Sequence, residues 1–293
     1  MSLSTRFQTS WELMKASLRV LRDQPLLLLF PVITFVCTIA LALFFLAPIL
    51  VIVFSTGWTA NQDWNAVGEK FNRAFYVYGV VIYLVSMFMA TFFNVAFYRE
   101  ILRALAGEPV SVGNGLRFAV RKLPSIVLWS LLAATVGLII RAIEERLGWL
   151  GKIIMGLVGV AWSVAAVFAI PVIIRREDTN PLSVLRDSAM TLKQTWGEAL
   201  IGFVGIRLAG GMLVGLTLIS ALIIAAAFLL LHSMWALAAG GVLWLGAILV
   251  GSFLTNMATH VYRCALYVYA SEGVVPGGFT PEMMNAGWKV KKA

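Results

Sequence analysis

Residues 169–202 read AIPVIIRREDTNPLSVLRDSAMTLKQTWGEALIG and place a dense cluster of charge between two long stretches that contain almost none. Over the whole chain 60% of residues are hydrophobic and 13% are charged, whereas a soluble domain is about half apolar and about a quarter charged. A membrane span needs about 20 apolar residues, so 293 residues hold several spans but no sizeable soluble domain. The sequence therefore predicts an integral membrane protein.

Six stretches with little or no charge are candidate spans. They cover residues 25–54, 74–98, 124–140, 153–174, 199–231 and 235–262. Taken in order, they predict an all-α bundle of six transmembrane helices in three hairpins. The fifth stretch has 33 residues, which is too long for one perpendicular crossing. We expect it to tilt, to break near Gly210-Gly211 or to begin as an interfacial segment.

Lysine and arginine are divided unevenly between the segments that separate these stretches. Seventeen fall in the amino-terminal segment, the second and fourth connections and the tail, against five in the first and third connections. Because cytoplasmic loops retain Lys and Arg, both termini are predicted to be cytoplasmic. Much of the net charge of +9 would then lie where anionic lipid headgroups can meet it.

A short basic segment with helical apolar spacing precedes each hairpin. Its apolar positions are, in chain order, Phe7, Trp11, Met14, Leu18 and Leu21, then Val112, Leu116, Ala119 or Val120, and Leu123, then Leu182, Leu185, Ala189, Leu192 and Trp196. Helices of this kind lie flat at a membrane surface with the apolar face down. We name their candidate interfacial cations the basic collar: Arg19, Arg117, Arg121, Arg186 and Lys193.

Short identities predict a threefold repeat of one interfacial helix and one hairpin. They are Leu18-Arg19, Leu116-Arg117 and Leu185-Arg186 in the basic segments, and Tyr98-Arg99 and Tyr262-Arg263 at the ends of hairpins one and three. We expect one membrane domain over residues 1–293, with units of about 1–98, 99–174 and 175–262 and a cytoplasmic tail, 263–293. In the tail, Thr280 can cap a further helix with Pro281 at its first position.

The charged cluster of 169–202 fits the start of the third interfacial helix. Pro181 suits its first turn, and one of residues 178–180 can cap it. Glu177 would lie near the positive end of the helix and Lys193 near the negative end. Because capping and the helix dipole account for this charge, we expect no catalytic role for it.

The same stretch resembles the repeated phrase of a broad group of poorly characterised prokaryotic six-span membrane proteins. The group includes the membrane domain found beside some glycerophosphodiester phosphodiesterases and the YciC-like inner-membrane proteins. The matching positions are Pro171, Glu177, Leu185, Ser188, Leu192, Lys193 and Trp196. The resemblance implies a scaffold of repeated hairpins in a prokaryotic inner membrane. It does not carry over a phosphodiesterase activity, which would belong to a separate soluble domain.

Arg207 is the one charged residue inside a predicted span. Ionisable residues in a membrane are candidates for function, yet Arg207 lies about eight residues from the start of its span and can snorkel to the surface. Asn256, His260 and Arg263 share one face of the last span, and Asn94 lies on the second. With Arg207 they could form a cavity for an anionic or lipid headgroup, and ordinary hydrogen bonding between helices is the alternative.

The sequence carries few features that indicate an enzyme. His232 and His260 are the only histidines and are predicted on opposite sides of the membrane, and the chain has no Walker, HExxH, GxSxG or CxxC motif. We predict no catalytic residue, metal or cofactor, and no nucleic acid as partner. The leading hypothesis is a non-enzymatic membrane protein that organises anionic lipid, a protein partner or a second copy through the basic collar. The alternative is a transporter or binding protein for an anionic or amphiphilic solute or lipid.

Overall fold

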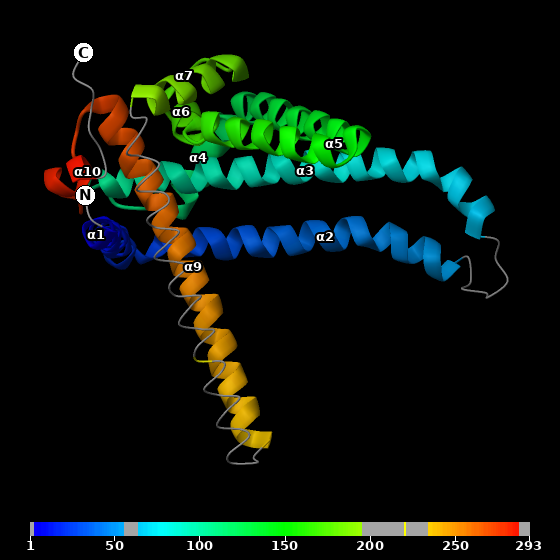
Figure 1. The fold of residues 1–293 in the computed structure, drawn as a ribbon, viewed down its shortest axis with the longest axis horizontal. Helices are drawn as coiled ribbons and strands as arrows, with labels where there is room; N and C mark the ends of the chain where they lie inside the picture. The colour runs from blue at the N-terminus through cyan, green and yellow to red at the C-terminus, as the bar shows by residue number, and fades with distance from the viewer. Residues whose placement is uncertain (1–2, 56–63, 195–219, 221–233, 287–293) are drawn as a thin grey trace. The chain divides into compact units, whose positions relative to one another are not determined.

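The computed structural model describes residues 3–55, 64–194, 220 and 234–286, and every regular element in this part of the chain is helical. The helices are α1 (Leu3–Asp23), the short 3-10 helix η1 (Pro25–Leu28), α2 (Leu29–Ser55), α3 (Trp64–Leu105), α4 (Val112–Arg121), α5 (Leu123–Ala165), α6 (Ala169–Arg175), α7 (Pro181–Gln194), α9 (Met234–Glu272) and α10 (Pro281–Ala286) (Figure 1). The all-α prediction is therefore confirmed for the described residues.

Five described segments are long and apolar enough to cross a membrane. They are Pro25–Val51, Tyr76–Leu105, Leu123–Trp149, Gly151–Arg175 and Ala238–Glu272. Each overlaps one of the predicted spans, while the remaining predicted span, 199–231, lies outside the described residues except for Ser220. Large apolar side chains on these segments face outward, as Phe35 does at 65% exposure and Phe44 at 71%. Such surfaces suit lipid rather than water, which indicates a membrane protein.

Four of the five described spans are longer than the apolar stretches that predicted them, and the first, Pro25–Val51, is shorter. The second was expected to end at residue 98, but α3 remains helical to Leu105. Glu100 interrupts the apolar run and is itself fully buried, and Ile101 and Leu105 beyond it are buried as well. The helix continues because packing on both sides of the acidic residue supports it.

The described helices group into two compact units, and the first is built from α2 to α7. In it α2 and α3 run side by side (Figure 1) and touch through Phe30 and Phe97, whose ring centroids are 5.5 Å apart. Further along the pair, the Tyr78 hydroxyl donates a 2.5 Å hydrogen bond to the Phe45 carbonyl. Aromatic packing and one half-buried hydroxyl therefore connect the two long helices at two separate points.

A sharp reversal divides α5 into two arms. Gly148 has φ +61°, a left-handed conformation that glycine adopts at little cost. The arms lie against each other, and Trp129 stacks on Trp162 with 6.1 Å between ring centroids and 11° between planes (Figure 1). The Ser130 hydroxyl also lies 3.5 Å from the Met87 carbonyl oxygen of α3. These contacts place α5 against both itself and α3.

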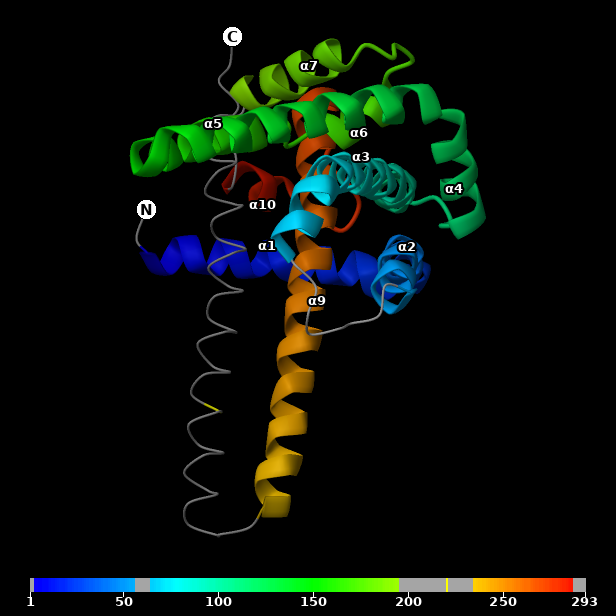
Figure 2. The same ribbon diagram turned by 90° about the vertical axis from the view of Figure 1, so that its right-hand side faces the viewer.

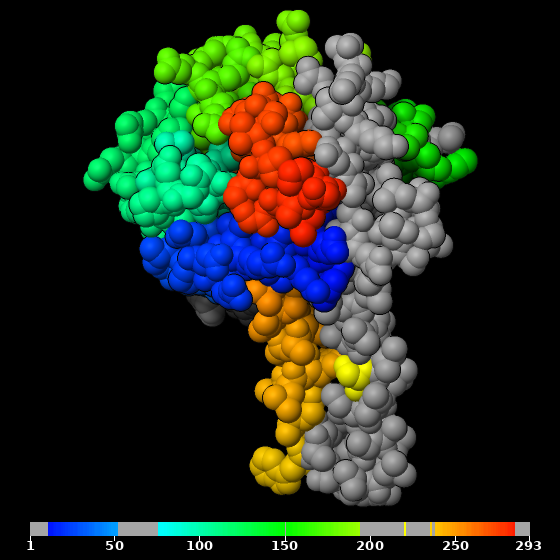
Figure 3. Space-filling model, turned by 90° about the vertical axis from the view of Figure 1, so that its left-hand side faces the viewer, coloured from blue at the N-terminus to red at the C-terminus, as the bar shows by residue number. Residues whose placement is uncertain are grey.

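The second unit contains α1, residues 101–110, the last residues of α7 from Met190 onward, α9 and α10. Here α1 crosses α9 (Figure 2), with Met14 packed against Ala258 and both side chains buried. The short helix α10 lies against α1 at the surface (Figure 3). The Gly277 amide donates a 2.9 Å bond to the Leu105 carbonyl, which ties the turn before α10 to the end of α3.

The α10 helix bears out the expected cap in the tail. The Thr280 hydroxyl accepts a 3.3 Å hydrogen bond from the Met283 amide, and Pro281 is the first helical residue. Proline at this position loses nothing, because the first amides of a helix have no partner within it. The threefold repeat of hairpins stays a prediction, since its third hairpin includes residues outside those described.

Candidate functional site

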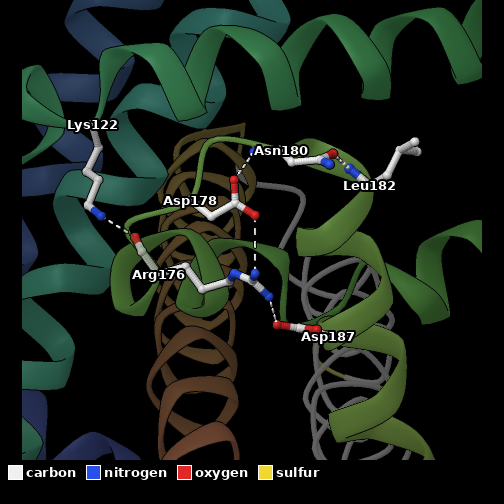
Figure 4. Close-up of polar contacts among 6 residues, drawn as sticks. All are labelled: Lys122, Arg176, Asp178, Asn180, Leu182 and Asp187. Atoms are coloured by element: carbon white, nitrogen blue, oxygen red, sulfur yellow. Dashed lines mark hydrogen bonds and ion pairs between the residues drawn. The ribbon is translucent and has the colours of Figure 1, made fainter.

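The charge of the 169–202 stretch gathers around Arg176, which follows α6. Its guanidinium pairs with Asp187 of α7 and with Asp178, 3.2 Å away, while its backbone carbonyl accepts a hydrogen bond from the Lys122 ammonium (Figure 4). We name these four residues the Arg176 cluster. It joins three segments of the first unit: the start of α5, the end of α6 and the middle of α7.

The loop before α7 forms two successive side-chain turns (Figure 4). The Asp178 carboxylate accepts a 2.9 Å bond from the Asn180 amide, and the Asn180 side-chain oxygen accepts a 3.0 Å bond from the Leu182 amide. Asn180 therefore caps α7 directly before Pro181, as expected for one of residues 178–180. The Asn180 amide lowers the pKa of Asp178, helped by the Ser183 hydroxyl and by Arg176.

A buried serine seats α7 against the break between α5 and α6. The Ser188 hydroxyl donates a 2.6 Å bond to the Ala165 carbonyl and accepts a 3.0 Å bond from the Phe168 amide. Ser188 is fully buried, in line with the buried Val184 and Leu192. One side chain of α7 thus satisfies two backbone groups where helical bonding is interrupted. The sequence marked Ser188 through the resemblance and through its spacing to Lys193, which matches that of Ser10 and Lys15, but neither signal indicated these backbone contacts.

The α4 helix is seated equally closely on α2 and α3. A Cβ atom added at Gly115 would lie 2.9 Å from the Ala96 carbonyl oxygen and 3.0 Å from the Phe30 ring. At the helix start, the Ser111 amide donates a 2.7 Å bond to the buried Glu100 carboxylate, and the Ser111 hydroxyl caps α4 at the Asn114 amide. Both the depth and the register of α4 are therefore determined by contacts within the first unit.

Two cations flank the ring of Phe118 on α4. The Arg99 guanidinium lies 4.9 Å and the Lys122 ammonium 5.9 Å from the ring centroid. Partial burial lowers the pKa of Lys122, and the nearby Glu177 opposes this shift. The sequence did not single out Phe118. Its position four residues before Lys122 nevertheless predicts a contact between the ring and that cation, because such residues are neighbours on a helix.

The three basic helices form where the apolar spacing predicted them, but their buried faces differ from the predicted stripes. On α1, Met14 and Leu21 are buried as expected, whereas Trp11 is 38% exposed and Leu13, outside the stripe, is 1% exposed. On α7, Leu182 is 62% exposed. Protein covers part of each apolar face, so these helices do not place the whole stripe against the membrane.

All five residues of the basic collar have exposed side chains: Arg19, Arg117, Arg121, Arg186 and Lys193. Among the described residues none of the five takes part in an ion pair. Arg117, Arg121 and Arg186 belong to the first unit, and Arg19 and Lys193 belong to the second. Each basic helix therefore presents unpaired positive charge to its surroundings.

The residues of the predicted cavity are only partly described. Asn256, His260 and Arg263 lie on α9 at the spacing of one helix face, with Asn256 exposed and the other two half-buried. Asn94 is half-buried on α3 and belongs to the other unit, and Arg207 lies outside the described residues. The cavity therefore stays a prediction. Within the described ranges, no cluster of three or more His, Cys, Asp or Glu could hold a metal ion.

Comparison with known proteins points to one family. No curated protein and no solved structure matches the chain. Residues 73–278, more than two thirds of the chain, match the model of a family of unknown function, DUF6159. The matched part contains α4, the Arg176 cluster and α7. The chain therefore belongs to DUF6159, a family of unknown function.

Proposed function

We propose that this chain is a non-enzymatic membrane protein that organises anionic lipid at the basic side of the membrane, and so positions a protein partner or a second copy there. The exposed, unpaired basic collar is the observation that carries the proposal. Each collar cation near an anionic leaflet contributes about 1 kcal/mol of attraction. Several such cations on separate helices can gather lipid without any chemical step.

The positions of the basic helices along the chain support contact with headgroups. α1 ends at Asp23, just before the span Pro25–Val51, and α4 ends at Arg121, with only Lys122 between it and the span Leu123–Trp149. α7 follows Gly151–Arg175 after a short loop. Since a span ends at the headgroup level, cations on these helices lie within reach of lipid phosphates.

The proposed orientation places both termini in the cytoplasm of a prokaryotic cell, with the chain in its inner membrane. The lysine and arginine asymmetry favours this, and so does the pairing of charge in the first arm of α5, close to the Gly148 turn. There Arg141 lies 3.1 Å from Glu145, its neighbour one helical turn away. The likeness to the YciC-like proteins and to the membrane domain beside some phosphodiesterases fits the same scaffold role, and we include it in the proposal.

A cavity for an anionic solute or lipid is the second candidate function. The polar face of α9 that carries Asn256, His260 and Arg263 favours it, because polar residues on one face of a span are costly against lipid. In this proposal Arg207 would supply the charge that holds the ligand. Loss of a bound anionic lipid or solute on Arg207→Ala, in a protein that stays folded, is the expected result.

The leading proposal is tested by removing three collar charges together: Arg19→Gln, Arg117→Gln and Arg186→Gln. The purified protein is placed in bilayers that mix phosphatidylglycerol and phosphatidylcholine. Electron paramagnetic resonance with spin-labelled lipids then measures how strongly each lipid is restricted at the protein surface. We expect the wild type to prefer phosphatidylglycerol, and the triple variant to lose most of this preference because its surface attracts anions less strongly.

A matched variant removes three charges from the other side: Arg141→Gln, Arg146→Gln and Lys152→Gln. It should keep the wild-type preference for phosphatidylglycerol. This result would mean that the position of the charges, rather than the total charge, determines the lipid preference. An unchanged preference in the collar variant would exclude the proposed function.

A further inference from the structure

We propose that α4, together with Arg99, forms a discrete binding site for the phosphate group of an anionic lipid. This inference rests on the proposed function and deepens it, because it assigns one site and one ligand chemistry to a part of the basic collar. The site lies wholly within the first unit. Its cations are Arg99, Arg117, Arg121 and Lys122.

The inner face of α4 is closed by packing against α2 and α3, so the helix can present its arginines only on the outer side. Ala119 is fully buried, and the Cβ position of Gly115 is occupied by atoms of α2 and α3. The bond from the Ser111 amide to Glu100 adds a further restraint at the start of the helix. Because the helix cannot roll, Arg117 and Arg121, one turn apart, are held together on its exposed side.

The positive charge of this site has little compensation. No Asp or Glu occurs between Val112 and Lys122, and neither Arg117 nor Arg121 forms an ion pair with any residue that the structure describes. Glu100 accepts the Ser111 amide and Glu108 pairs with Arg103 at 2.8 Å, while Glu177 lies near Lys122 and partly offsets that one charge. Like charges one turn apart repel, and a bound anion removes that repulsion.

Phe118, which lies between Arg117 and Arg121 in the chain, has two further cations at its ring. Arg99 and Lys122 both approach its ring, and the bond from the Lys122 ammonium to the Arg176 carbonyl holds that ammonium in position. Cations arranged before the ligand arrives lose less entropy on binding. The Arg176 cluster therefore acts as the support for one side of the site.

The depth of the site selects a lipid phosphate over a free one. Only Lys122 separates the end of α4 from the span Leu123–Trp149, and Arg99 lies near the end of Tyr76–Leu105. Between the two exposed arginines, Val120 is 53% exposed and adds apolar surface beside the charge. A ligand that offers a phosphate next to acyl chains satisfies both parts of this surface.

The test is native mass spectrometry of the full-length protein, stripped of lipid in detergent and titrated with phosphatidylglycerol or, as a neutral control, phosphatidylcholine. The site variant is Arg117→Gln with Arg121→Gln, and the matched variant is Arg19→Gln with Arg186→Gln. Both remove two exposed collar charges, so folding should be retained. We expect the site variant to retain phosphatidylglycerol about tenfold less strongly than wild type, and the matched variant to bind as wild type does.

Three outcomes would overturn the site. Equal losses in both double variants mean diffuse surface charge, which leaves the proposed function standing. Unchanged binding in both excludes a phosphate site on α4, and the spin-label measurement then decides the wider proposal separately. Displacement of phosphatidylglycerol by millimolar inorganic phosphate, with phosphate found on the protein, would assign a free anion as the ligand.

Discussion

Gly113 and Gly115 stand two residues apart on α4 and have opposite surroundings. A Cβ at Gly113 meets no atom within 4 Å, whereas one at Gly115 meets the Ala96 backbone, the Glu100 side chain and the Phe30 ring at 2.9–3.0 Å. Side chains can adjust to a new methyl group more readily than a carbonyl oxygen can. The close approach of α4 to α3 therefore depends on the missing side chain at one of these two positions.

Gly115→Ala is expected to destabilise the protein by about 1–3 kcal/mol, because the added methyl group overpacks a contact with backbone. Gly113→Ala should be neutral or slightly stabilising, by at most roughly 1 kcal/mol, since alanine is the better helix former. Chemical unfolding in detergent micelles measures both. Equal stabilities of the two variants would mean that α4 does not sit this closely on α3.

A sequence can reveal that residues such as Gly115 exist but not what they touch. The two glycines of α4 look alike in the chain, and Ser188 looks like any small polar residue of a basic helix. Their roles depend on partners that are far away in sequence: residues 30 and 96 for Gly115, and the backbone of residues 165 and 168 for Ser188. Tertiary contacts of this kind carry no local pattern.

At the scale of the helix, the loop of residues 176–180 determines how α7 begins. Asp178 receives the Asn180 amide and lies beside Arg176, so its charged form is stabilised in the folded state. Its folded-state pKa lies below its unfolded value, and the unfolded chain therefore binds more protons as the pH falls. The stability that Asp178 contributes is complete above about pH 4 and is lost below it.

The thermal midpoint of the wild type should therefore fall more steeply than that of Asp178→Asn as the pH drops from about 5 to about 3. Asparagine can still accept the Asn180 amide, so the turn itself is kept and only the titrating charge is removed. Differential scanning fluorimetry over this pH range makes the comparison. Parallel curves for the two proteins would contradict a stabilising charge at Asp178.

The elements themselves follow from the sequence more readily than their orientation does. Apolar residues three and four apart predicted helices at α1, α4 and α7, and capping rules predicted the start of α7. The same rules misjudge the faces, because Leu13, which is buried, and Trp11, which is exposed, are both apolar. Hydrophobicity alone does not distinguish a face covered by protein from one that meets lipid.

At the scale of the whole molecule, the spans require that the two ends of an α5 arm lie on opposite sides of a membrane. After replacement of Cys37 and Cys264 by alanine, Asn114→Cys should react with an impermeant maleimide only in inverted vesicles. Arg146→Cys, near the Gly148 turn, should react in intact spheroplasts. Labelling of both cysteines from the same side would contradict a crossing by Leu123–Trp149.

The positions of the apolar spans follow from composition, because the cost of charge in a bilayer leaves a strong pattern in the sequence. Five of the six predicted spans correspond to described helices. The predicted cavity is different in kind, since it depends on how residues from three predicted spans meet. Spacing places Asn256, His260 and Arg263 on one helix face, but it says nothing about which helix that face meets.

The bonds of Ser188 also have a consequence for how this protein is made. Synthesis proceeds from the amino end, so the span Gly151–Arg175 emerges before Ser188, which lies twenty residues after Phe168. Lipid offers no hydrogen bonds to the peptide groups at the α5–α6 break. The break thus receives these two hydrogen bonds only when a later part of the chain reaches it. A ribosome that stalls before Ser188 is made leaves the span in the bilayer without the Ser188 bonds at the break.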